Sequence, residues 1–482
     1  MLKKSTYLLI LAVLAAGFVL VLQKSSLYDE GISAVASRRI LQGEWPYKRF
    51  WLIYTPFQFF LHAGFLKISD SLMMLRLLDF LVKVLCVYTA VRIIRAERPG
   101  IPSYQQNLLA AGLLAVIFSS GIALYPIFLA VLLALAAYYF YRKERLWLCA
   151  LLAVLSVFTK FEVGLFLVAS LAITDLLRIP RKEISCKHTV SLLGKQLFVG
   201  IVAVLLLGWL CGFRNLYECL IDFPVNVYPA HRRLPLPHID KFTSYVPLAI
   251  LAIALALIYT AILSFDRRKK NDPLIVFMAL FAGLMTYKFV VRSSYANVVM
   301  IIFLLCLFVV AIAKSTGWLK WIVASPVILL FFFSLYKLNF FVNRTLPDLR
   351  KYGYTEVCMN EPAENEIISF IRQHHNSSFY FGVKNHDRVA YNPVMFYFFV
   401  DRVMTYYQEL HPGQVTTADV QQQIVQELQT GKVEYVLLLN TEFNEPNQSS
   451  VDTHVELLDQ YIREHYKEIQ SFGPDYTLMQ LK

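Results

Sequence analysis

The stretch Tyr28-Asp29-Glu30-Gly31 follows the first hydrophobic segment of the chain and opens an amphipathic loop that runs to Asp70. Its two adjacent carboxylates lie a few residues beyond the end of an apolar run. Charged groups at a membrane boundary are costly and commonly serve a function, so Asp29 and Glu30 are candidate functional residues. The structural alternative is that Asp29 caps a helix beginning near Gly31.

The composition around this stretch is that of a membrane protein. Of the 482 residues, 57% are hydrophobic, which is too apolar for a soluble chain of this size. The formal net charge of +12 comes from basic clusters between the apolar runs, as expected of cytoplasmic loops under the positive-inside rule. We therefore predict a polytopic membrane protein and exclude a nucleic-acid partner.

Eleven apolar segments are predicted to cross the membrane. A helix that spans the hydrocarbon core needs about 20 apolar residues, and some of these segments would be shorter crossings. They are residues 5–22, 71–94, 105–119, 122–141, 146–158, 161–177, 190–213, 245–265, 273–291, 296–313 and 321–338. The first is expected to remain uncleaved, because no small-x-small site precedes Gln23. With the N-terminus cytoplasmic, the basic clusters fall inside and the C-terminus outside.

The segment from 146 to 177 tests this count. A single crossing there would place the basic run 267–270 outside, so we predict two short helices with a turn at Thr159-Lys160-Phe161-Glu162. The turn puts Lys160 on the outer face. The alternative is that Lys160 only extends its amine to the membrane surface.

Acids and cations on the predicted outer side come from different segments. The first loop carries Asp29 and Glu30, with a helical pattern from Ile32 to Ile40. The outer cations are Lys160, Arg232, Arg233 and Arg292. Acids from one loop and cations from three others favour one site between helices. The two neighbouring arginines could instead bind anionic headgroups.

Two further outer segments are candidate substrate loops. Residues 54–66, beginning at Tyr54, are apolar but too short to span, so they lie at the interface or re-enter and cover the site. His231 lies in a loop rich in proline and basic residues, although His231 and His238 are more often plain loop histidines. Within the membrane, Asp79 and Lys83 are four residues apart and are predicted to neutralise each other.

After Leu338 the composition becomes that of a soluble protein. We predict helices at 362–374, 416–430 and 451–466, strands at 379–383, 394–400 and 435–439, and a hairpin of 469–472 with 477–481. This predicts an all-α membrane domain, residues 1–338, and a small extracytoplasmic α/β domain, residues 339–482. Cys219 and Cys358 are both on the presumed outer side, so a disulfide between them is possible.

Carboxylates facing cations at the membrane surface suit a substrate with a phosphate at headgroup depth. The cations would hold the phosphate and neutralise its charge as it leaves. A carboxylate would take the proton of an attacking hydroxyl. This is the chemistry of sugar transfer from a polyprenyl phosphate.

The first outer loop also resembles a known family. Residues 28–65 read YDEGISAVASRRILQGEWPYKRFWLIYTPFQFFLHAGF. They are similar to the first outer loop of GT-C glycosyltransferases of the protein-mannosyltransferase-like group, which includes dolichyl-phosphate-mannose and lipid A aminoarabinose transferases. Two further elements are similar to those of the same family: the segment Gly43-Glu44-Trp45-Pro46-Tyr47 and the turn Thr159–Glu162. The Arg233-Leu234-Pro235-Leu236-Pro237 segment and the tail residues 382–412 resemble bacterial members.

The resemblance implies a GT-C fold and roles for several residues. Asp29 would be the catalytic base, Glu30 would support it or help bind a metal, and Lys160 would contact the lipid phosphate. Arg232 or Arg233 and Arg292 are candidates by charge and side. The second outer loop, residues 119–121, lacks the acid that some relatives have, which counts against a divalent metal. Thr55 replaces the lysine of the aminoarabinose transferases, so that substrate is not assigned.

The predicted function is an inverting glycosyltransferase in the cell membrane, using a polyprenyl-phosphate sugar and an extracytoplasmic lipid, glycan or protein acceptor. A transporter or flippase of lipid-linked sugars would also use intramembrane charges, but matched broken helices in inverted repeats are not apparent. A non-catalytic subunit of an envelope polysaccharide assembly is the third possibility. In that case the tail would bind the partner.

Overall fold

The computed structural model describes residues 2–233, 245–265, 272–291, 295–313, 318–352, 362–388, 391–441, 445 and 447–482. Their contacts group into two compact units, and each is described by itself. The first unit comprises Met1–Gln23, Arg76–Val204 and Pro235–Lys351. The second comprises Lys24–Leu75, Leu205–Leu234 and Tyr352–Lys482, so parts of the predicted outer loops group with the tail.

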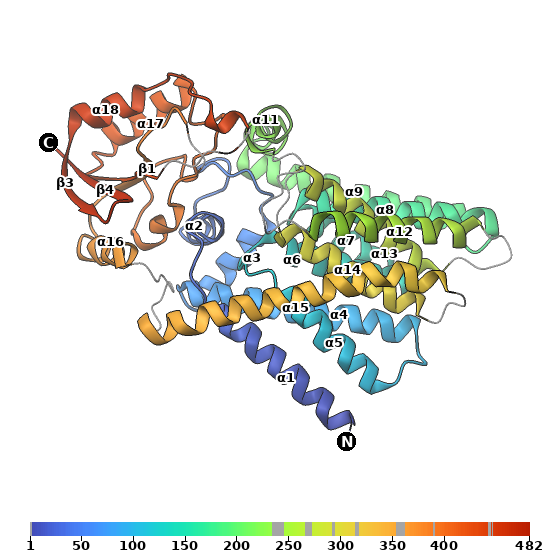
Figure 1. Ribbon diagram of the computed structural model, residues 1–482. Coiled ribbons are helices and arrows are strands. Elements are labelled where there is room, and N and C mark those ends of the chain that lie inside the picture. The colour runs from blue at the N-terminus through green and yellow to red at the C-terminus, as the bar shows by residue number, and fades with distance from the viewer. Residues whose placement is uncertain are drawn as a thin grey trace. The chain divides into compact units, whose positions relative to one another are not determined.

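All eleven predicted apolar segments are helical (Figure 1). They form α1 (Leu2–Val21), α4 (Leu72–Glu97), α5 (Ser103–Phe118), α6 (Pro126–Arg142), α7 (Leu146–Val157), α8 (Phe161–Arg178), α9 (Cys186–Cys211), α12 (Tyr245–Phe265), α13 (Pro273–Val291), α14 (Tyr295–Ile312) and α15 (Leu319–Tyr352). Among the described residues, five helices are long and apolar enough to cross a membrane. The number of crossings therefore stays a prediction. α15 continues as one helix past the predicted domain boundary at residue 338.

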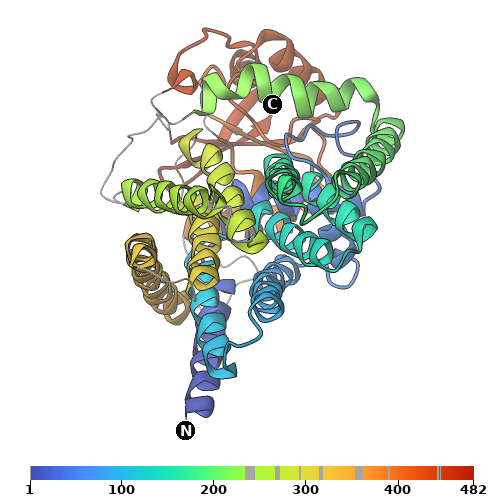
Figure 2. The same cartoon turned by 90° about the vertical axis from the view of Figure 1, so that its right-hand side faces the viewer.

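Small residues set the closest helix contacts in the first unit. α7 and α8 form the predicted hairpin, and a Cβ on Gly164 would lie 2.3 Å from the backbone nitrogen of Val157, so only glycine fits there. α1 packs beside α5, as Figures 1 and 2 show, where Gly17 faces the ring of Phe118. Both contacts depend on the absence of a side chain at the glycine.

In the second unit the loop after α1 contains α2 (Asp29–Leu41) and the short α3 (Phe57–Leu66). The segment after α9 is helical through α10 (Phe213–Tyr217), η2 (Glu218–Val227) and α11 (Tyr228–Arg232), seen as one long green helix in Figure 2. The middle part has the wider turns of a π-helix. Such turns accommodate Pro224, which has no N–H to donate.

The tail is an α/β fold. It contains α16 (Pro362–Gln373), β1 (Phe379–Val383), η3 (Val394–Phe399), α17 (Ala418–Thr430), β2 (Tyr435–Leu439), η4 (Gln448–Ser450), α18 (Leu457–His465), β3 (Tyr466–Phe472) and β4 (Tyr476–Leu481). The sheet order is β1-β2-β4-β3, with β1 and β2 parallel and the other pairs antiparallel. The predicted hairpin is confirmed, with Gly473 at positive φ in its turn.

Both faces of the central strands are covered, which explains their unbroken apolar sequences. On one face Phe379 contacts Phe370 of α16, and Phe381 contacts Phe396 of η3. On the other face Tyr380 reaches His386, whose ring is bound by Asp459 of α18. Figure 1 shows α16 on one side of the sheet and α17 with α18 on the other.

Two predictions for the tail were wrong. The predicted strand 394–400 is instead the 3-10 helix η3, Val394–Phe399. Pro393 cannot donate to a sheet, and the Asn392 amide binds the carbonyls of Phe381 and Gln408. The last helix begins at Leu457 and not at residue 451. His454 has positive φ and its N–H donates to Asp452, so a turn precedes the helix.

Candidate active site

The acidic pair lies at the start of α2, and its two carboxylates have different surroundings. Ser26 Oγ accepts the N–H of Asp29 at 3.1 Å, and the N–H of Ser26 donates to Glu30 Oε1 at 3.4 Å. These two bonds hold the turn that precedes α2, which begins at Asp29 with Tyr28 at its N-cap position and has no side-chain cap bond. The alternative in which Asp29 caps a helix beginning near Gly31 is therefore wrong.

Adjacent positions on a helix point in different directions, so one carboxylate is accessible and the other is enclosed. Glu30 is only 2% exposed, whereas Asp29 is exposed. Asp29 can reach a ligand. Glu30 is placed to hold the first turn of the helix.

Tyr28, immediately before the pair, joins three segments distant in sequence. Its hydroxyl lies 2.8 Å from His411 Nε2 and 3.4 Å from Arg232 Nη2. Since arginine can only donate, the Tyr28 oxygen accepts from Arg232 and its proton is directed to His411. The His411 tautomer with its proton on Nδ1 follows from this network.

Arg232 is a buried cation held from two sides. Its guanidinium carbon lies 5.7 Å from the centre of the Tyr28 ring, and Nη1 is 3.8 Å from Glu445 Oε1. A buried charge needs such partners, since removal from water is costly. The predicted cation Arg232 thus contacts Tyr28, the residue that precedes Asp29.

Aromatic rings line this region. The Tyr391 ring lies 5.5 Å from that of Tyr28. Burial first, and then the charge of Asp29, raise the pKa of Tyr391 to about 12. The His411 ring is surrounded by Trp51, Phe223 and Tyr228 at 5.2, 5.9 and 6.2 Å. Asp29 is therefore close enough to Tyr391 for its charge to act on that phenol.

Glu409 is fully buried close to His411. Its Oε1 accepts the N–H of Ile53 at 3.2 Å, and its Oε2 is 3.8 Å from His411 Nε2. Burial raises the pKa of the Glu409 carboxyl to about 8, against the opposing effects of the Ile53 N–H and the charge of Arg232. Glu409 is therefore mainly neutral at pH 7.

The other predicted residues of the second unit have different positions. Arg233 is exposed, and its carbonyl accepts from the Asn447 amide at 3.3 Å. His231 lies in α11, so its predicted position in a loop was wrong, and its Nδ1 is 3.0 Å from the carbonyl of Val227, the residue before that helix. The Tyr54 carbonyl accepts from the Tyr47 hydroxyl at 2.7 Å. Arg292, His238 and Cys358 lie outside the described residues.

Lys160 belongs to the first unit, at the predicted turn between α7 and α8. Its side chain is 5% exposed, with Nζ 3.4 Å from Glu162 Oε1 and 5.3 Å from the centre of the Tyr125 ring. Glu162, the acid of the Thr-Lys-x-Glu turn, thus forms an ion pair with Lys160.

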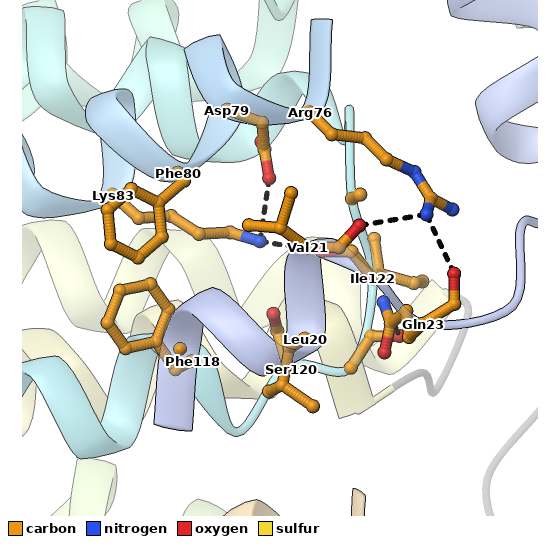
Figure 3. Close-up of a pocket in the computed structure, with 13 residues that line it drawn as sticks. Leu20, Val21, Gln23, Arg76, Asp79, Phe80, Lys83, Phe118, Ser120 and Ile122 are labelled. Carbon is orange, nitrogen blue, oxygen red and sulfur yellow. Dashed lines mark hydrogen bonds and ion pairs between the residues drawn. The ribbon is translucent and has the colours of Figure 1, made fainter. Parts of the chain in front are cut away.

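A second polar cluster of the first unit surrounds a small pocket of about 20 Å³ (Figure 3). The predicted pair is confirmed, with Lys83 Nζ 2.8 Å from Asp79 Oδ2, and Lys83 also donates to the Ile122 carbonyl at 2.7 Å. Arg76 donates to the carbonyls of Val21 and Gln23 at 2.9 and 2.7 Å. These bonds tie the end of α1 to α4 and account for the intramembrane charges.

Sequence reasoning missed the contributions of Glu409, His411 and Tyr391 to the site. The available signal was the tail segment 382–412, which contains all three and resembles bacterial GT-C members. For a metal, the described residues contain no group of three or more His, Cys, Asp or Glu placed to hold one. Asp29 and Glu30 thus have no third ligand of this kind within the described ranges.

Comparison with known proteins identifies the fold. No family model and no curated protein matches the sequence. The crystal structure of ArnT from Cupriavidus metallidurans bound to undecaprenyl phosphate aligns with 99% of this chain and 98% of that chain, at a TM-score of 0.55 and 13% identity. The GT-C fold predicted from the first loop is confirmed: this chain has the fold of ArnT.

Proposed function

We propose that this protein is a multi-pass membrane glycosyltransferase that transfers a sugar from a polyprenyl-phosphate donor to an extracytoplasmic acceptor. The observation that carries the proposal is the likeness of the whole chain to a protein crystallised with undecaprenyl phosphate. The exposed Asp29 next to a cation-bound tyrosine supports it. The site would lie on the outer face of the inner membrane, with the N-terminus inside.

In this proposal Asp29 is the general base. Its carboxylate takes the proton of the acceptor hydroxyl, whose oxygen attacks the anomeric carbon as the bond to the phosphate oxygen breaks. Attack opposite to the leaving group inverts the anomeric configuration. A base must come within hydrogen-bond distance of the proton, which an exposed carboxylate permits and the buried Glu30 does not.

The leaving polyprenyl phosphate gains negative charge, which cations stabilise. Lys160, Arg232, Arg233 and Arg292 are the proposed phosphate-binding residues. The hydrogen bond to Tyr28 and the pairing with Glu445 hold Arg232 in one orientation, so its charge needs little rearrangement during the reaction. The rings of Tyr28 and Tyr391 offer an apolar surface on which a sugar can stack.

The test uses purified full-length protein in lipid nanodiscs with labelled undecaprenyl-phosphate sugars. Asp29→Asn should reduce transfer by about 10²- to 10⁴-fold, the usual contribution of a general base. Asp419→Asn is the matched control, because Asp419 is also an exposed acid in the first turn of a helix. Turnover unaltered by Asp29→Asn would reject the assigned base.

The same assay separates the proposal from the other function classes. Transfer by the purified protein alone excludes a non-catalytic subunit, and release of labelled product excludes a simple flippase. Lys160→Gln should raise the KM for the donor, because a phosphate contact is lost. The acceptor class would follow from mass spectrometry of envelope glycans with and without the protein.

A further inference from the structure

The second unit contains a pocket whose net positive charge has no role in the proposed transfer reaction. It has a volume of about 180 Å³ and is lined by Arg38, Asp70, Ser71, Leu72, Arg372, Phe398 and Phe399. These residues come from α2, the start of α4, α16 and η3. Two cations and one acid give the lining a net positive charge, which favours an anion.

Arg38 is held rigidly at this pocket. Its Nη1 donates to the carbonyl of Phe398 and lies 3.5 Å from that of Val400, and its guanidinium carbon is 5.2 Å from the centre of the Phe398 ring. Since the backbone carbonyls fix the plane of the guanidinium, its remaining N–H groups have a defined direction. Preorganised arginine binds carboxylate or phosphate with little loss of side-chain freedom.

Asp70, the acid of the pocket, forms an ion pair with Arg38 that a ligand can replace. Asp70 Oδ2 lies 3.3 Å from Arg38 Nη2, but the Asp70 side chain is 46% exposed. An ion pair of this kind is weak in water, so a ligand anion can replace it. The second cation, Arg372, stacks over the Phe399 ring at 5.8 Å.

The position of the pocket in the sequence indicates where its ligand comes from. Leu72 begins α4, whose apolar run is the second predicted span. The neighbouring Ile68 and the α4 residues Leu77 and Leu81 are exposed apolar side chains, as expected of surfaces in contact with lipid. The predicted crossing by α4 would place a pocket at its first residue at the depth of lipid headgroups.

We propose that this pocket binds the phosphate of an anionic membrane lipid, with Arg38 and Arg372 on the phosphate oxygens and Phe398 and Phe399 against the glycerol and upper chain. Arginine pairs with phosphate through parallel N–H donors. Anionic lipids concentrate basic groups at the membrane surface, and here the aromatic rings select a lipid over a free anion. The site is separate from the proposed sugar transfer.

The test is native mass spectrometry of the detergent-solubilised full-length protein, titrated with phosphatidylglycerol or phosphatidylcholine. Wild-type protein should retain phosphatidylglycerol preferentially. Arg372→Gln should weaken that binding about tenfold, the loss expected for one charge-assisted contact. The matched control is Arg463→Gln, since Arg463 is an exposed arginine of the same unit paired with Glu456.

Equal phosphatidylglycerol binding by Arg372→Gln and Arg463→Gln would overturn the proposal. Displacement of the lipid by an equal concentration of inorganic phosphate would show a free-anion site and overturn the lipid assignment. Arg372 is chosen for the substitution because its side chain is exposed, whereas Arg38 is bound by backbone carbonyls of its own unit. The assay contains no sugar donor, so its outcome is independent of the proposed transferase activity.

Discussion

Glu409→Gln tests how the buried side of the candidate site is built, because it removes one ionisable group and keeps the shape of the side chain. Glu409 is 0% exposed, and among the described residues its Oε2 has no hydrogen-bond partner. Burial raises the pKa of the carboxyl from 4.5 to about 8. Glutamine imitates the neutral acid that the folded protein prefers.

The size and sign of the effect follow from the pKa. Between pH 4.5 and about 8 the folded protein keeps a proton that the unfolded chain has lost. Stability must therefore fall as the pH rises through this window. The contribution is fully present below pH 4.5 and lost above about pH 8. At about 1.4 kcal/mol for each tenfold change in proton affinity, the loss is on the order of 4–5 kcal/mol.

The assay is hydrogen exchange of the full-length protein, read by mass spectrometry in peptides around residue 409 and corrected for the intrinsic pH effect. Wild-type protein should lose protection between about pH 5 and pH 8, whereas Glu409→Gln should keep it. The exposed Glu434→Gln variant is the control and should behave as wild type. The same loss of protection in Glu409→Gln and wild type would refute the reasoning.

Three further substitutions test the site and its support. Tyr28→Phe keeps the ring but removes the hydroxyl that joins the buried Arg232 to the buried His411. The kcat/KM for sugar transfer should fall about tenfold. An unchanged value would show that the hydroxyl has no part in transfer. Gly31→Ala should destabilise the protein by about 1–3 kcal/mol in thermal unfolding, because a Cβ would lie 2.5 Å from the nitrogen of Met395. Gly413→Ala should cost about 1–3 kcal/mol because its φ is +78°. Gly64→Ala is the common control: nothing lies within 4 Å of its added Cβ, and a melting temperature as low as that of the other two would contradict this account.

Local sequence predicted the parts of the fold that depend on short-range periodicity. The apolar runs became helices at the expected positions, and a turn separates α7 from α8 where the charge rule requires it. The pair of Asp79 and Lys83 formed because residues four apart share a helix face. The sheet hairpin at Gly473 followed from its turn residues.

Long-range packing decided the rest. Residues 394–400 are as apolar as a strand, but contact with α2 and the sheet made them a 3-10 helix. The bond between Tyr28 and His411 joins residues 383 positions apart, and no local pattern predicts such a pairing.

The sequence by itself determined that two acids follow the first apolar helix and that a lysine and several arginines follow others. Only the tertiary structure decided that Asp29 is exposed, that Glu30 is buried and that Arg232 and His411 meet at Tyr28. The physical reason is that secondary structure depends on neighbours along the chain. Burial and charge pairing depend on which surfaces of distant segments pack together.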